Sequence, residues 1–118
     1  MKFVQLVLSC WLITCSASTQ AERPFVVIHQ QGNDDCHTFR IPAIAVTNDG
    51  TLLAVYDMRY RSRRDLQGHM DIGLSRSTDG GKTWENPRPI MDMGTFGGLV
   101  EDLNGCSDPN ILVDKETG

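Results

Sequence analysis

The sequence has 118 residues, of which 40% are hydrophobic, and a formal net charge of −4 at pH 7. A chain of this length has room for one modest hydrophobic core. Its acidic balance argues against nucleic acid as a partner, because binding to a phosphate backbone requires clustered Lys and Arg side chains.

Residues 1–21 have the pattern of a secretory signal peptide. Lys2 precedes an apolar run from Phe3 to Thr14, and small residues follow the run. This run is shorter than the roughly 20 residues that a membrane span requires. Cys15 lies in a loose lipoprotein-type cleavage site, so lipidation at Cys15 remains an alternative to simple cleavage. We therefore expect an exported protein that is secreted or periplasmic, or one that is anchored to the cell surface through a lipid on Cys15.

Removal of the signal peptide leaves 97 residues with a formal net charge of −5, since Lys2 is the only charged residue lost. Two cysteines remain, Cys36 and Cys106. In an exported protein they can form one disulfide or stay as two buried thiols, and the sequence favours neither. Two cysteines are too few to build a disulfide scaffold.

The rest of the chain consists of short apolar or alternating runs separated by turn signals, which is typical of β-strands. In one run Met70, Ile72 and Leu74 alternate with polar or small residues, the period-2 pattern of a half-buried strand. No window has a sustained helical period, so we predict an all-β chain. The predicted strands are Phe25–His29, Ile41–Val46, Thr51–Asp57, Met70–Arg76 and Asn110–Asp114.

The last predicted strand leads into Lys115–Gly118, a turn that normally precedes a returning strand. A sheet that stops at such a turn leaves an unpaired edge. We therefore interpret residues 22–118 as the N-terminal part of a larger domain.

Charged residues that suggest chemistry lie on or directly after the predicted strands. The motif FRIP places Arg40 at the start of an apolar strand, where burial is costly unless an anion pairs with it. A surface or salt-bridged arginine is the alternative. The loop after the next strand begins with Arg59 and reaches Asp65. A run of charge is usually a solvated face, which is the position that we expect for Arg61, Arg63 and Arg64.

The stretch SRSTDGGKTW, residues 75–84, predicts a tight hairpin turn. Its glycines supply positive φ at low steric cost, the Asp79 carboxylate is suited to accept hydrogen bonds from nearby backbone N–H groups, and Trp84 offers a large surface to bury. Whether this turn also has a function depends on the motifs around it.

Together these motifs resemble the opening of a bacterial-type sialidase, an exo-acting hydrolase of terminal sialic acids. The resemblance covers about residues 36–118 and rests on FRIP, on Arg59 placed 19 residues after Arg40, on Asp65 placed 6 residues later, and on SDP at 107–109. The tight turn fits the family's Asp box, SxDxGxTW, through Ser77, Asp79, Gly81, Thr83 and Trp84. Since this box lies away from the active site in the family, the resemblance implies that the turn is structural rather than catalytic. The resemblance implies a six-bladed β-propeller, of which this chain would supply the first one or two blades.

The resemblance also implies roles for four side chains. Arg40 would be the first of three arginines that bind the substrate carboxylate, whose geometry a guanidinium matches in pairs. Arg59 and Asp108 would line the pocket near the 4-hydroxyl of the sugar, although a turn cap before Pro109 is the alternative for Asp108. Asp65 would be the general acid/base that protonates the glycosidic oxygen and then takes a proton from water.

The expected activity is that of a retaining exo-α-sialidase, with sialylated glycoproteins, glycolipids or oligosaccharides as substrates. The resemblance implies a tyrosine nucleophile assisted by a glutamate, both outside this chain, which would make the chain inactive alone. Two alternatives remain, a non-catalytic Asp-box propeller that binds glycans or proteins, and a trans-sialidase. No cofactor is implied, and no metal is expected because His29, His37 and His69 lack ligand spacing.

Overall fold

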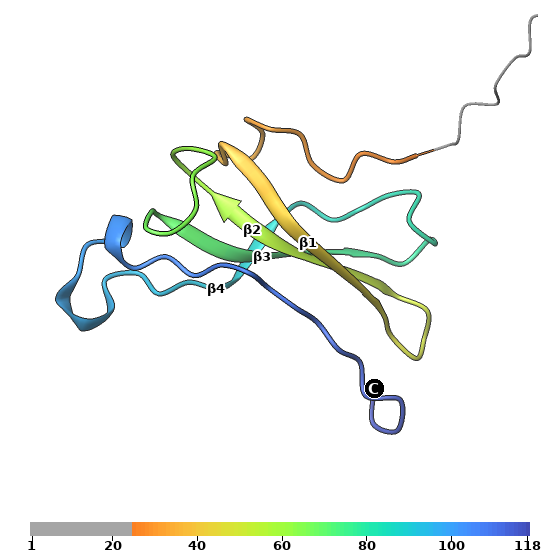
Figure 1. Ribbon diagram of the computed structural model, residues 1–118. Helices are drawn as coiled ribbons and strands as arrows, with labels where there is room; N and C mark the ends of the chain where they lie inside the picture. Colours follow the sequence, from red (N-terminus) through yellow and green to blue (C-terminus); the bar gives the residue numbers. More distant parts are fainter. Residues whose placement is uncertain (1–24) are drawn as a thin grey trace, which may run out of the picture.

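The computed structural model describes residues 25–118, so the expected signal peptide and the lipidation site at Cys15 lie outside the described part. Four strands, β1 (Thr38–Val46), β2 (Leu52–Arg59), β3 (Met70–Ser77) and β4 (Arg88–Met91), form one antiparallel sheet in the order β1-β2-β3-β4 (Figure 1). Two short 3-10 helices follow, η1 (Phe96–Gly98) and η2 (Glu101–Leu103). Within residues 25–118 no helix is long and apolar enough to cross a membrane. The prediction of an all-β chain is confirmed.

Three of the five predicted strands are present, and two predictions are wrong. The first three strands of the sheet match the predicted runs but are longer, since β1 begins at Thr38 and β2 ends at Arg59. The runs 25–29 and 110–114 are extended segments that pair with no strand of the sheet. Packing explains one apolar residue of each run, because Ile28 and Ile111 each lie against one face of the sheet.

The two faces of the sheet carry separate apolar clusters, because successive side chains of a strand point to opposite sides. Ala54, Tyr56 and Met58 of β2 form the first cluster with Cys36. Val55 of β2 forms the second with Ile72 and Leu74 of β3. In Figure 1 the orange N-terminal segment and the blue C-terminal segment lie on opposite sides of the sheet, where each covers one cluster.

A buried polar group fixes the N-terminal segment to the first face. Nε2 of His29 lies 2.8 Å from the Tyr56 hydroxyl and 2.9 Å from the Ser75 hydroxyl. Burial lowers the pKa of His29, and the nearby charge of Asp34 opposes that effect only in part. Tyr56 is thus a packing residue of the first cluster.

Strand β1 contains a bulge directly after Arg40. The pairing with β2 shifts register between Arg40 and Ala43, and Ile41 has a φ of 51°. The left-handed region is unfavourable for a β-branched residue, so this backbone is strained. Pro42 is compatible with the bulge because it has no N–H to offer the ladder. Bulges of this kind bend a strand and are frequent next to functional sites.

The turn 77–84 connects β3 to β4 and has the predicted form. Gly80 and Gly81 have φ values of 73° and 88°. The Asp79 carboxylate accepts hydrogen bonds from the hydroxyls of Ser77 and Thr83 and from the backbone N–H groups of Lys82 and Thr83. These bonds, that of the Thr83 hydroxyl first, hold the pKa of Asp79 well below its usual range.

Both cysteines of the described chain are free thiols. Cys36 is buried and its Sγ donates to the carbonyl oxygens of Thr38 and Arg59 at 3.3 and 3.5 Å, whereas Cys106 is half-buried. Of the two alternatives that the sequence left open, the structure therefore has thiols and not a disulfide.

Candidate active site

Strand β2 places two charged side chains, Asp57 and Arg59, inside the sheet. Their side chains are 0% and 2% exposed. Since they are two residues apart on one strand, they point to the same face. Oδ2 of Asp57 accepts hydrogen bonds from Nε of Arg59 at 3.1 Å and from Nη2 at 2.7 Å. Burial alone would lower the pKa of the Arg59 guanidinium. The hydrogen bonds and charge of Asp57 act in the opposite direction, with a smaller contribution from Asp65, and the pKa of Arg59 is raised as a result.

Asp65 lies in the loop between β2 and β3 and is held close to Arg59. Nη2 of Arg59 lies 3.4 Å from Oδ1 of Asp65, and Nη1 of Arg59 donates to the Arg63 carbonyl oxygen at 3.0 Å. The Asp65 side chain is nevertheless 65% exposed. The carboxylate is therefore anchored on one side and open to solvent on the other, which suits a group that exchanges protons with a bound substrate.

Asp108 reaches the same place from the C-terminal segment. Its backbone N–H donates to Oδ1 of Asp57 at 2.9 Å, and its φ of 61° lies in the left-handed region. The Asp108 carboxylate is on an exposed residue and makes no side-chain hydrogen bond within residues 25–118, which gives no support to the turn-cap alternative. Gly105 allows this approach, because a Cβ there would lie 2.2 Å from the Gly68 carbonyl oxygen.

Arg40 lies directly opposite Asp57 in the register of β1 and β2. Residues that face each other in an antiparallel pair share a face, with Cβ atoms about 4.5–5.5 Å apart. Arg40 is exposed and makes no ion pair with any residue of the described chain, which fits the surface alternative and not the salt-bridged one. Its guanidinium is therefore available to bind an anion.

The four predicted site residues thus meet around one residue that the sequence analysis did not single out. Asp57 contacts Arg59 through one carboxylate oxygen and the backbone of Asp108 through the other, and it faces Arg40 across the ladder. Asp65 joins through Arg59. The available signal was an aspartate inside an apolar strand two residues before an arginine, since aspartate is almost never fully buried unless it is paired.

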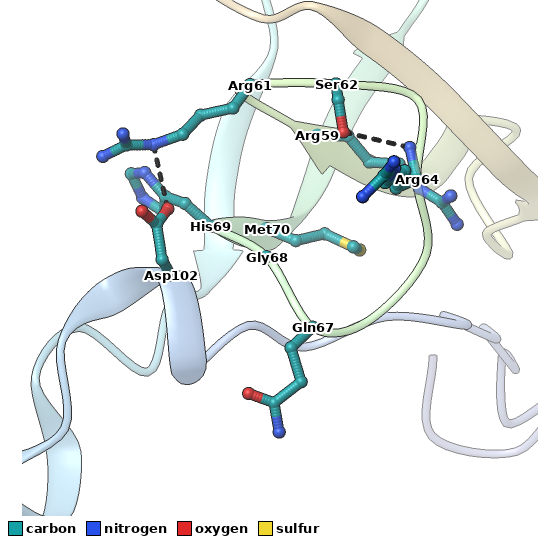
Figure 2. A pocket seen from close by; sticks show the side chains of 9 residues that line it. All are labelled: Arg59, Arg61, Ser62, Arg64, Gln67, Gly68, His69, Met70 and Asp102. Atoms are coloured by element: carbon teal, nitrogen blue, oxygen red, sulfur yellow. Dashed lines mark hydrogen bonds and ion pairs between the residues drawn. The ribbon is translucent and has the colours of Figure 1, made fainter.

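A cavity of about 240 Å³ lies beside Arg59, under the loop that carries Asp65 (Figure 2). In Figure 2 the Arg61 side chain extends from this loop to Asp102 of η2, and the two are joined by an ion pair of 2.9 Å between Nε and Oδ1. As predicted, Arg61, Arg63 and Arg64 are exposed. The cavity is lined by Arg59, Arg61, Ser62, Arg64, Gln67, Gly68, His69, Met70 and Asp102.

Tyr60 forms a tyrosine–carboxylate contact on the other face of the sheet. Its hydroxyl donates to Oδ2 of Asp71 at 2.7 Å, and its ring packs against the cluster that contains Tyr56 and Met58. Burial, with the bond to Asp71, raises the pKa of Tyr60, which is the opposite of what a nucleophile needs. Within residues 25–118 no group of three His, Cys, Asp or Glu side chains is arranged to hold a metal ion.

Comparison with known proteins adds independent information. The chain is 56% identical over 92 residues to a sialidase of Bacteroides fragilis and 42% identical over 87 residues to a sialidase of Micromonospora viridifaciens. The matched segment belongs to the bacterial-type sialidase family. These matches cover 78% and 74% of the chain, but the chain spans only 17% and 13% of the two sialidases. No family model matches the chain.

Solved sialidase structures agree with this assignment. The Hadza microbial sialidase Hz136 has a TM-score of 0.75 at 45% identity, over 77% of this chain and 18% of that one. The leech intramolecular trans-sialidase has a TM-score of 0.54 at 29% identity, over 60% of this chain and 11% of that one. The expected fold class is thereby confirmed, with the four-stranded sheet as one blade of a sialidase β-propeller.

Proposed function

We propose that this chain is the N-terminal part of an exo-α-sialidase that removes terminal sialic acids from glycoconjugates. The observation that carries the proposal is the convergence of Arg40, Arg59, Asp65 and Asp108 around the buried Asp57, in a segment 56% identical to a sialidase. Sialylated glycoproteins, glycolipids and oligosaccharides are the proposed substrates.

In the proposed mechanism the substrate carboxylate binds to Arg40, which is exposed and faces the same side of the sheet as Asp57. Paired N–H donors of a guanidinium match the two oxygens of a carboxylate. We place Arg59 and Asp108 near the sugar's 4-hydroxyl, as the resemblance implies, and Asp57 holds both of them. These contacts orient the sugar before any bond breaks.

Asp65 then protonates the glycosidic oxygen as the aglycone leaves and afterwards takes a proton from the attacking water. Its position supports this role, since the carboxylate contacts Arg59 yet remains open to solvent. The nucleophile is a tyrosine assisted by a glutamate, supplied from outside residues 25–118, as in the sialidase exception among retaining glycosidases.

The test is substitution of Asp65 by Asn in the complete protein. Turnover of a natural sialoside falls by roughly 10²- to 10⁴-fold, the usual contribution of general acid catalysis. An aryl sialoside, whose leaving group needs little protonation, loses much less. Equal losses on the two substrates would reject the acid role, and absence of turnover by the unsubstituted protein would favour a binding propeller.

The products distinguish hydrolysis from sialyl transfer. The similarity to the leech intramolecular trans-sialidase, solved in complex with 2,7-anhydro-Neu5Ac, makes this the second candidate. Hydrolysis releases free sialic acid, whereas intramolecular transfer releases its anhydro form, and mass spectrometry of the products separates the two. The greater identity to proteins named sialidase favours hydrolysis.

We also propose that the protein is exported after cleavage of residues 1–21. Mass spectrometry of the mature N-terminus tests this, because a lipid on Cys15 adds a mass that simple cleavage does not.

A further inference from the structure

We propose that Asp57 is a positioning residue for the 4-hydroxyl side of the substrate pocket. The proposal rests on the proposed sialidase function and adds a residue that does not itself touch the substrate. Asp57 is fully buried, so it acts only through the groups that it holds.

The two oxygens of Asp57 have different tasks. Oδ2 accepts two hydrogen bonds from the Arg59 guanidinium, which fixes both the position of the guanidinium and its plane. Oδ1 accepts the backbone N–H of Asp108, a residue 51 positions later in the sequence. One carboxylate therefore sets the distance between two pocket residues that belong to separate segments.

The backbone at Asp108 depends on this contact. A φ of 61° is uncommon for a residue other than glycine and persists only when the surroundings impose it. The bond from its N–H to Asp57 joins this backbone to the sheet. Asp108 itself is an exposed residue.

The influence of Asp57 extends to the loop of the acid/base through Arg59. The same guanidinium that binds Asp57 donates to the Arg63 carbonyl oxygen and contacts Asp65. Only a carboxylate serves all these contacts, because it accepts hydrogen bonds on both oxygens, whereas an amide presents N–H donors on one side. Asparagine at this position would face either the guanidinium or the Asp108 N–H with a donor.

The test compares two substrates in the complete enzyme, a sialoside and its 4-deoxy analogue. Asp57→Asn lowers kcat/KM for the sialoside by roughly 10- to 100-fold, the scale of a misplaced binding group. The 4-deoxy analogue loses at least about threefold less than the sialoside, because it shares any effect on the Asp65 loop but lacks the hydroxyl that Arg59 and Asp108 recognise. A structural role alone would lower both values equally, and that result overturns the proposal.

Two further variants keep the test decisive. Asp57→Glu retains the charge beside Arg59 but moves the carboxylate by one methylene. If the Asn variant fails to fold, the Glu variant should show the same larger loss of kcat/KM for the sialoside than for the 4-deoxy analogue. A Glu variant with unchanged selectivity overturns the proposal. Ser75→Ala is the matched control, since Ser75 is also fully buried in the sheet but bonds to Tyr56 on the opposite face. If the unsubstituted enzyme turns over neither substrate, the proposed function fails instead.

Discussion

At the scale of single residues, the buried pair of Asp57 and Arg59 is poorly explained by stability. Apolar residues of similar volume in place of a buried ion pair are often neutral or stabilising, whereas loss of one partner costs about 3–5 kcal/mol. An apolar pair would thus fill this part of β2 at least as well. The charges are better explained by what they hold, which is the backbone of Asp108 and the loop of Asp65.

The exposed Arg40 provides a residue-scale prediction. Arg40→Lys keeps the positive charge but loses the paired donors, so the affinity for a sialoside or a carboxylate inhibitor falls by about 1.5–3 kcal/mol. Isothermal titration calorimetry of the complete protein measures this loss. Arg88→Lys is the control, because Arg88 is an exposed arginine of β4 outside the site. A similar loss in both variants would mean that Arg40 contributes only to the general charge.

At the scale of elements, the turn 77–84 contributes to stability through the Asp79 carboxylate. Hydrogen bonds, first that of Thr83, lower the pKa of Asp79 below its ordinary 3.8. A lowered pKa in the folded state means that the stabilisation is fully present above about pH 4 and is lost as the pH falls through the lowered pKa. Asp79→Asn therefore lowers Tm at neutral pH, while the kinetics of the folded enzyme change little.

Thermal unfolding between pH 2 and pH 7 checks this prediction, because the difference in Tm between the two proteins should narrow in acid. Asp35→Asn serves as the control, since Asp35 is exposed and makes no side-chain hydrogen bond within the described residues. Loss of activity by the Asp79 variant at an unchanged Tm would contradict the structural role.

The sequence predicts the elements that depend on local pattern and misses those that depend on distant contacts. Strands β2 and β3 are predictable because their apolar residues recur at the spacing of a buried face. Strand β4 has four residues including Pro89, too short and irregular for any pattern. The runs 25–29 and 110–114 each place one isoleucine, Ile28 and Ile111, against the sheet without pairing with a strand, so their hydrophobicity does not report strand pairing.

The same distinction holds for the site. The roles of Arg40, Arg59, Asp65 and Asp108 stay predictions that rest on a set of spaced motifs, because each residue alone has an ordinary surface explanation. The role of Asp57 depends on a contact with a residue 51 positions away, which no local window contains. The strained φ of Ile41 is equally invisible, since it arises from the register shift between two strands.

At the scale of the whole molecule, the sheet exposes apolar side chains on its outer strands and covering segments. Phe25 is 80% exposed and Leu112 is 91% exposed, and further exposed apolar residues include Ile44, Val46, Ile90 and Met91. In a propeller such residues pack against neighbouring blades. Exposed apolar surface of this kind promotes association.

Residues 22–118 expressed alone should therefore aggregate or remain loosely packed, and should release no detectable sialic acid. Size-exclusion chromatography and a fluorogenic sialoside assay test the two statements. The inactivity follows from the proposed mechanism, which takes its tyrosine nucleophile and two of its three arginines from outside this chain. A monomer that melts cooperatively and cleaves sialosides would overturn both the blade assignment and the position of the nucleophile.

The arginines of the β2–β3 loop also make the proposed active site vulnerable to proteolysis. Arg61 is held by Asp102, whereas Arg63 and Arg64 are exposed and form no ion pair within residues 25–118. Exposed loops are preferred sites of proteolytic cleavage, so a trypsin-like protease should cut after Arg63 or Arg64, as limited digestion and mass spectrometry can verify. Such a cut separates Arg59 from Asp65 along the chain. The loop that presents the proposed acid to the substrate is thus also the place where a single cleavage would inactivate the enzyme.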